Sequence, residues 1–100
     1  MSYLLQVDFP FSGPWGDAMT ESMQGLANSI TQEPGLIWKI WTENQTEQQA
    51  GGVYLFDTEA HAQAYLDMHA ARLTAAGVTE IRSRIFLVNA ALSEITQFSA

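Results

Sequence analysis

The sequence predicts an α+β fold in which a four-stranded antiparallel sheet carries two helices on one face. Strand-like and helix-like segments follow one another in the order strand, helix, strand, strand, helix, strand. The chain has 100 residues, which is enough for one small domain and too few for two separate cores. A βαββαβ order in a chain of this size is typical of the ferredoxin-like arrangement. We therefore expect one ferredoxin-like domain over residues 1–100.

The first strand and helix are indicated by residue type and spacing. Residues 3–9 (YLLQVDF) are rich in strand-forming side chains, and residues 10–16 have the glycine and proline content of a loop. Over residues 17–31 apolar side chains recur every three or four positions, which predicts an amphipathic helix. Its apolar stripe consists of Met19, Met23, Leu26 and Ile30. Pro34 and Gly35 follow, and they end the helix because proline disfavours helical backbone at the residue before it.

A hairpin is expected next. Residues 36–44 (LIWKIWTEN) form a strand with tryptophan on both faces, and residues 51–56 (GGVYLF) form its partner. Strict alternation puts Leu36, Trp38 and Ile40 on one face, and Ile37, Lys39, Trp41 and Glu43 on the other.

The second helix and fourth strand complete the pattern. Residues 59–76 are alanine-rich and follow a candidate N-cap at Asp57 or Thr58, and Gly77 suits the C-terminal cap. A fourth strand is expected over residues 78–88, and a short helix or a docked arm is expected over residues 89–100.

Composition excludes several classes of function. The chain carries 4 Lys+Arg against 11 Asp+Glu, a formal net charge of −7, so no nucleic-acid partner is expected. With no cysteine there is no disulfide framework, thiolate nucleophile or Cys-ligated metal. The N-terminal residues lack a basic signal region, and no apolar run approaches the roughly 18 residues of a membrane span. We expect a cytoplasmic protein without a membrane partner.

The sheet face opposite the helices is expected to be covered by a second copy of the chain. Arg82, Arg84, Phe86 and Val88 share one face of the fourth strand, and the second strand has tryptophan on both faces. An open face this apolar is unfavourable in water. The sequence therefore predicts a homodimer in which two sheets pack face to face.

His69 is the most informative polar residue. Helical spacing places it near the centre of the buried stripe of residues 59–76, with Arg72 on the shoulder. It could face a cavity and orient or deprotonate a phenolic ligand. The alternative is a neutral core histidine bonded to a backbone carbonyl or to the Tyr54 hydroxyl. No metal site is expected, because His61 and His69 are eight residues apart rather than four and lack a third ligand in register.

Aromatic residues make up 11% of the chain and gather in the elements that should face one another. They include Trp15, Trp38, Trp41, Tyr54, Phe56 and Tyr65. These side chains, with Met19 and Met23, could form a flat apolar pocket for a planar aromatic ligand. Core and dimer-interface packing is the other interpretation.

Four segments together resemble the YdhR-type monooxygenase family, in the same order and over nearly the whole chain. They are residues 11–19 (FSGPWGDAM), 32–43 (QEPGLIWKIWTE), 50–56 (AGGVYLF) and 64–73 (AYLDMHAARL). The resemblance implies a dimeric α+β barrel built from ferredoxin-like protomers. It also implies kinship with small barrel enzymes that oxidise phenols with dioxygen and without metal or flavin. Haem is not expected, because the first strand offers Gln6 and Asp8 where haem-degrading relatives use asparagine.

Carried onto this sequence, the resemblance makes His69 the catalytic base or orienter. Trp38 and Tyr65 become candidate walls of the substrate site and Arg72 the residue that steadies a phenolate. The apolar pocket described above adds Met23 and Tyr54 as candidate substrate-binding residues. The leading hypothesis is a homodimeric, cofactor-independent monooxygenase that oxidises a small aromatic or phenolic compound with dioxygen. The rival is a non-catalytic binding module for an aromatic small molecule, and a third is a structural dimer with a vestigial cavity.

Overall fold

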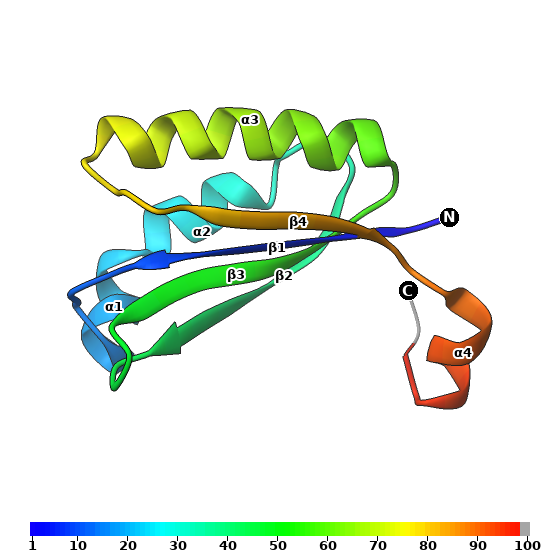
Figure 1. Ribbon diagram of the computed structural model, residues 1–100, viewed down its shortest axis with the longest axis horizontal. Helices are drawn as coiled ribbons and strands as arrows, with labels where there is room; N and C mark the ends of the chain where they lie inside the picture. The colour runs from blue at the N-terminus through cyan, green and yellow to red at the C-terminus, as the bar shows by residue number, and fades with distance from the viewer. Residues whose placement is uncertain (99–100) are drawn as a thin grey trace.

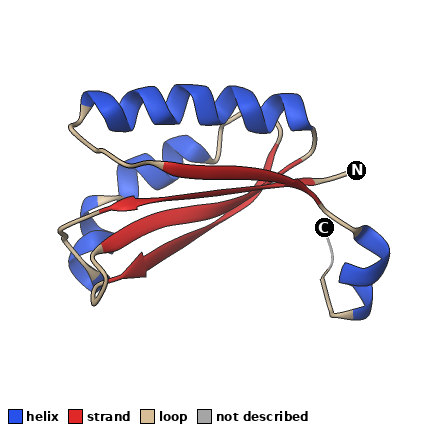
Figure 2. Ribbon diagram, in the orientation of Figure 1, coloured by secondary structure: helices blue, strands red, loops and turns tan. Residues whose placement is uncertain are grey.

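The computed structural model describes residues 1–98. A four-stranded sheet has its helices α1, α2 and α3 on one face, while α4 lies beyond the end of β4 (Figures 1 and 2). In chain order the elements are β1 (Tyr3–Pro10), α1 (Gly16–Ser22), α2 (Gln24–Ile30), β2 (Leu36–Asn44), β3 (Gln49–Phe56), α3 (Glu59–Ala75), β4 (Arg82–Leu87) and α4 (Ala90–Ile95). Within residues 1–98 no helix has the length and apolar character that crossing a membrane requires.

The strand order is β2-β3-β1-β4, and every neighbouring pair is antiparallel. The two central strands β1 and β3 are therefore not consecutive in the chain, because α1, α2 and β2 intervene between them. This topology confirms the predicted ferredoxin-like α+β fold.

The core lies between the sheet and the helices. Leu5 and Val7 of β1 meet Tyr54 and Phe56 of β3 there, and the helices contribute Ile30, Ala62 and Tyr65. All seven are at most 3% exposed. The buried residues of α3 are Ala62, Tyr65 and His69, so the helical spacing placed His69 correctly in the buried stripe.

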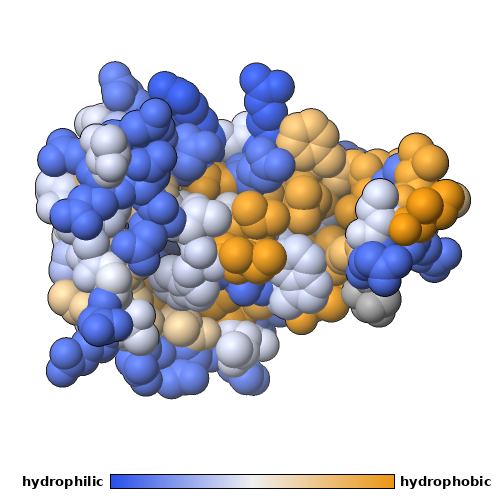
Figure 3. Space-filling model, turned by 90° about the horizontal axis from the view of Figure 1, so that it is seen from below, coloured by the Kyte–Doolittle hydropathy of each residue, from blue (hydrophilic) through white to orange (hydrophobic). Residues whose placement is uncertain are grey.

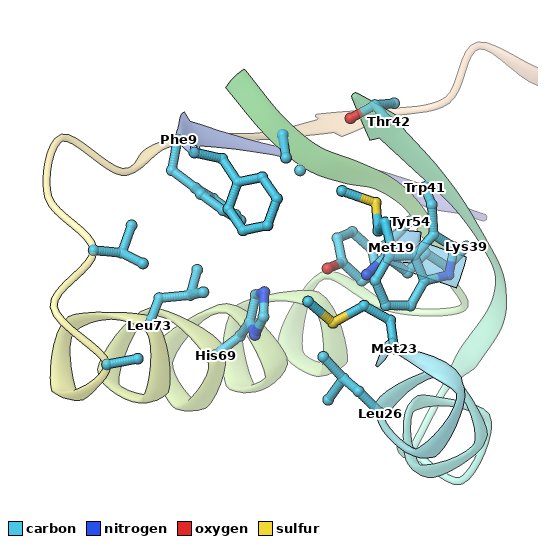
Figure 4. A pocket seen from close by; sticks show the side chains of 15 residues that line it. Phe9, Met19, Met23, Leu26, Lys39, Trp41, Thr42, Tyr54, His69 and Leu73 are labelled. Atoms are coloured by element: carbon cyan, nitrogen blue, oxygen red, sulfur yellow. The ribbon is translucent and has the colours of Figure 1, made fainter. Parts of the chain in front are cut away.

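The predicted helix over residues 17–31 is interrupted at Met23, which separates α1 from α2. The Ser22 hydroxyl donates to the Met19 carbonyl oxygen at 3.1 Å. A serine that bonds to the backbone of the preceding turn competes with the helical ladder, and Gly25 weakens the helix further. Despite this break, the side chains of Met19 and Met23 both face the sheet (Figure 4).

The fourth strand begins at Arg82 rather than at Val78. Glu80 has a φ of +55°, in the left-handed region, and this interrupts the extended backbone that pairing requires. Pairing with β1 therefore starts at Arg82, opposite Asp8.

A β-bulge in β2 changes which side chains face the helices. Leu36 pairs with Phe56 but Trp38 pairs with Leu55, so the register shifts by one residue between them. Because side chains alternate along a strand, the extra residue puts Lys39 and Trp41 on the helix face with Leu36, and Trp38 and Ile40 on the open face. The expectation that Leu36 and Trp38 share a face is wrong for this reason.

The open face of the sheet carries an apolar surface, seen from below in Figure 3. Ile40 is 54% and Phe86 43% exposed. The C-terminal segment covers part of this face, since the ring of Phe98 lies 6.5 Å from that of Trp38.

Candidate functional site

A cavity of about 290 Å³ lies between the sheet and helices α1, α2 and α3 (Figure 4). Its walls are mostly apolar. Phe9 lies in β1 and Phe11 just after it; Met19 lies in α1, Met23 between α1 and α2, and Leu26 in α2. Leu73 lies near the end of α3, and Ala76 and Val78 follow that helix. The polar residues that line it are Lys39, Thr42, Tyr54 and His69. An apolar pocket with a few polar groups is the usual form of a small-molecule site.

His69 enters the cavity from α3. Arg72, one turn later in the helix, determines which ring nitrogen of His69 carries the hydrogen. Arg72 Nη2 lies 3.0 Å from His69 Nδ1. A guanidinium keeps its protons, so it donates and Nδ1 accepts, which leaves the hydrogen of the neutral ring on Nε2. Burial, together with the positive charges of Arg72 and Lys39, lowers the pKa of His69 to about 4. At neutral pH the imidazole is therefore a hydrogen-bond donor through Nε2.

The rings of Tyr65 and Tyr54 pack against His69. The Tyr65 ring stacks on His69 at 5.2 Å, and its hydroxyl donates to the Tyr54 hydroxyl at 3.4 Å. Burial raises the pKa of both tyrosine hydroxyls above the usual range. Both phenols are thus neutral, and the Tyr54 hydroxyl is bonded to Tyr65 rather than to His69.

Lys39 is the second polar side chain of interest. Its Nζ lies 3.3 Å from the ring centroid of Trp41 and 4.7 Å from that of Tyr54. Burial, with a smaller contribution from the charge of Arg72, lowers the pKa of Lys39 to about 7. The amine is therefore present in both protonation states near neutral pH.

Metal-ligating side chains do not gather in the described part of the chain, where no three His, Cys, Asp or Glu residues come together. His61 lies at the N-terminal end of α3, where its Nδ1 is 2.7 Å from Asp57 Oδ1.

Comparison with known proteins places the chain in a family. Residues 4–99 match the family described as "Putative mono-oxygenase ydhR". The chain belongs to this family. No curated protein sequence is significantly similar to it.

Two solved structures share the fold of this YdhR-family chain. A protein of unknown function from Nitrosomonas europaea, NE2512, superposes with a TM-score of 0.62 at 18% identity, over 88% of this chain and 89% of that one. A "putative antibiotic biosynthesis monooxygenase" from Deinococcus radiodurans superposes with a TM-score of 0.55 at 12% identity, over 89% and 93%.

The site residues predicted from the sequence divide into two groups. His69, Met23 and Tyr54 line the cavity. Trp38, Tyr65 and Arg72 do not line the cavity. Trp38 lies on the open face of the sheet, and the Tyr65 ring stacks on His69 in the core. Arg72 contacts Nδ1 of His69. Of the two tryptophans in β2, Trp41 lines the cavity and Trp38 does not.

Sequence reasoning gave no site role to Lys39, Phe9 or Phe11. A signal was present for Lys39, which is one of four basic residues and stands in an otherwise apolar stretch between two tryptophans.

Proposed function

We propose that this protein is a cofactor-independent monooxygenase that oxidises a small aromatic or phenolic compound with dioxygen. The observation that carries the proposal is the cavity itself, an apolar chamber into which His69 presents an Nε2–H donor. In such a reaction the bound phenol loses its proton, and the electron-rich anion reacts with oxygen in a site that excludes water. Membership of the YdhR family supports this reaction class.

The cavity suits a planar ligand of modest size. Its volume of about 290 Å³ is just below the roughly 300–1,000 Å³ that is common for ligand pockets. Met19, Met23 and Trp41 provide a polarisable, apolar wall for an aromatic ring. His69 Nε2 would then donate a hydrogen bond to a ring oxygen and set the orientation of the ligand. Its role is that of orienter rather than base.

We further propose that the protein acts as a homodimer joined through the open faces of two sheets. Ile40 and Phe86 would be unfavourably exposed on this face in a monomer. Pairing of the two open faces about a two-fold axis would bury them and close the α+β barrel that the family resemblance implies.

A second candidate is a non-catalytic binding module for the same class of ligand. It is favoured by the pKa of His69, which at about 4 makes the imidazole a poor base at neutral pH.

Oxygen consumption distinguishes the two candidates. Metal-free protein is mixed with anthrones, naphthols and hydroquinones, with His69→Phe beside the wild type. Saturable oxygen uptake that is lost or reduced in His69→Phe supports the monooxygenase, and mass spectrometry of the product identifies inserted oxygen. Ligands that raise the melting temperature without oxygen uptake support the binding module. Uptake that is unchanged in His69→Phe removes this residue from the mechanism.

A further inference from the structure

We propose that Lys39 is the catalytic base of this cavity: its amine takes the proton of the ligand's hydroxyl group and holds the resulting anion as an ion pair. The inference rests on the proposed function, from which it takes the phenolic class of ligand. It adds the identity of the group that ionises the ligand.

Lys39 lies in the wall of the cavity. The bulge in β2 turns its side chain to the helix face, where Nζ lies against the rings of Trp41 and Tyr54 inside the cavity wall. In the described part of the chain no carboxylate forms an ion pair with it; the ion pair found there joins Asp57 to His61. An ammonium in apolar surroundings without an anion is unfavourable, so this site favours either the neutral amine or an anionic ligand.

The other polar groups of the cavity cannot accept the proton. His69 already accepts from Arg72 at Nδ1 and carries a hydrogen at Nε2, so toward the cavity it is a donor. Tyr54 is a neutral phenol, and Thr42 has only a hydroxyl group. Helices α1 and α2 contribute Met19 and Leu26, which have no ionisable group. Lys39 is therefore the lining residue with a basic lone pair near neutral pH, because burial has brought its pKa to about 7.

The proposed step moves one proton from the hydroxyl group of the ligand to the Lys39 amine. The O–H bond of the ligand breaks, the oxygen keeps the electron pair, and a new N–H bond converts the Nζ amine to an ammonium. The charges then neutralise each other in an apolar site, where a charge-assisted hydrogen bond is strong. The rings of Trp41 and Tyr54 stabilise the cation further. The Nε2–H of His69 donates a second hydrogen bond to the anion.

The test uses 2-naphthol as ligand, without oxygen and at pH 8, so that it measures ionisation separately from oxidation. Absorption spectra report whether the bound naphthol is an anion. Calorimetry in two buffers of different ionisation enthalpy reports whether a proton is released to solvent. The variants are Lys39→Met, Lys39→Arg and, as a control that removes one positive charge outside the cavity, Arg82→Met.

The wild type and Arg82→Met are expected to bind the naphtholate anion with little net release of protons, because the proton stays on Lys39. Lys39→Met should bind neutral naphthol roughly tenfold or more weakly, since a hydrogen bond to a charged group is lost. Lys39→Arg should bind the anion but release a proton to the buffer, because a guanidinium attracts an anion and cannot accept a proton.

Three results would overturn the proposal: naphthol that does not bind to the wild type, naphthol that binds to it in neutral form, or an anion that persists in Lys39→Met. Admission of air to the wild-type complex then tests the proposed function separately. Ionised naphthol without oxygen uptake would leave Lys39 as the base of a binding module, whereas oxygen uptake in Lys39→Met would leave the monooxygenase without this base.

Discussion

His69 is stabilised in its neutral form, and this makes the free energy of unfolding depend on pH. Its pKa is about 4 in the folded protein, against 6.5 for an unperturbed histidine. Below about pH 6.5 His69 is protonated in the unfolded chain but stays neutral in the folded protein. The free energy of unfolding therefore falls as the pH drops from 6.5 toward 4. Between pH 8 and pH 5 this single group should cost roughly 2 kcal/mol.

His69→Phe should lack this component, because phenylalanine does not titrate. Urea unfolding of both proteins at pH 8 and pH 5, at one protein concentration, measures the difference. The wild type is expected to lose about 2 kcal/mol more than the variant between the two pH values. Equal losses would show that His69 titrates alike in the folded and unfolded chains.

The buried amine of Lys39 lowers the free energy of unfolding when it is protonated. Its lowered pKa means that the folded protein disfavours the ammonium, so stability is lost as the pH falls from 10.5 toward about 7. Lys39→Met keeps the apolar stem and removes the charge, and we expect the free energy of unfolding at pH 7 to rise by roughly 1–4 kcal/mol. Lys39→Arg cannot shed its charge and should be less stable than the wild type.

The midpoints of urea unfolding at pH 7 rank these three proteins. If the midpoint is highest for Lys39→Met, lower for the wild type and lowest for Lys39→Arg, Lys39 destabilises the fold. This result supports a functional role for Lys39, since residues that destabilise a fold are frequent at functional sites. A Lys39→Met variant less stable than the wild type would mean that the contacts of the ammonium with Trp41 and Tyr54 outweigh its desolvation.

At the scale of elements, the bulge in β2 separates what the sequence predicts from what it does not. Regular periodicity gave the bounds of β2 correctly and placed His69 on the buried face of α3. The bulge depends on how β2 pairs with β3, and no residue pattern within β2 predicts it. The shift of one position exchanged Trp38 for Trp41 in the cavity wall and brought in Lys39.

The break between α1 and α2 was missed for a related reason. The apolar spacing from Met19 to Ile30 remains helical across Met23, so periodicity alone predicts one continuous helix. The site itself depends on contacts between α3, β2 and β1, which are far apart in the sequence. The sequence could therefore predict members of the site, such as Met23 and Tyr54, but not its boundary.

Two adjacent glycines in β3 give a matched pair of variants at this scale. A Cβ on Gly51 would collide with the backbone carbonyl of Val7 and lie 2.8 Å from the Cα of Asp8, so β1 and β3 would have to separate. A Cβ on Gly52 would lie 2.6 Å from Lys39 Cε, which is the far end of a flexible side chain, and 3.2 Å from both the Ile40 carbonyl oxygen and Tyr54 Cε1.

We expect Gly51→Ala to lose about 3 kcal/mol or more of folding free energy, or not to fold. Gly52→Ala should fold and displace the Lys39 amine. Circular dichroism and urea unfolding check the first expectation, and the spectrum of bound 2-naphthol checks the second. A folded Gly52→Ala protein that still ionises naphthol as the wild type does would contradict the second expectation.

At the scale of the whole molecule, the sheet has one face covered by helices and one face that is largely open. Phe86 and Leu87 are neighbours in β4 and point to opposite faces: Phe86 pairs with Leu4 on the open face, and Leu87 pairs with Tyr3 on the helix face. Both side chains are substantially exposed, at 43% and 55%. They therefore allow a test in which side-chain type, exposure and position are nearly matched.

Phe86→Glu should convert the protein to a monomer, because a two-fold interface would lose two apolar rings and would have to bury two carboxylates in their place. Leu87→Glu adds the same charge beside it and should leave the dimer intact. Sedimentation equilibrium gives the mass of each variant, with the wild type expected at twice the chain mass. A monomeric wild type would refute the dimer, and dissociation by Leu87→Glu rather than by Phe86→Glu would place the interface at the β4 edge. If the monomeric Phe86→Glu protein still binds and ionises 2-naphthol, the cavity is complete within one chain, as the arrangement of its lining residues indicates.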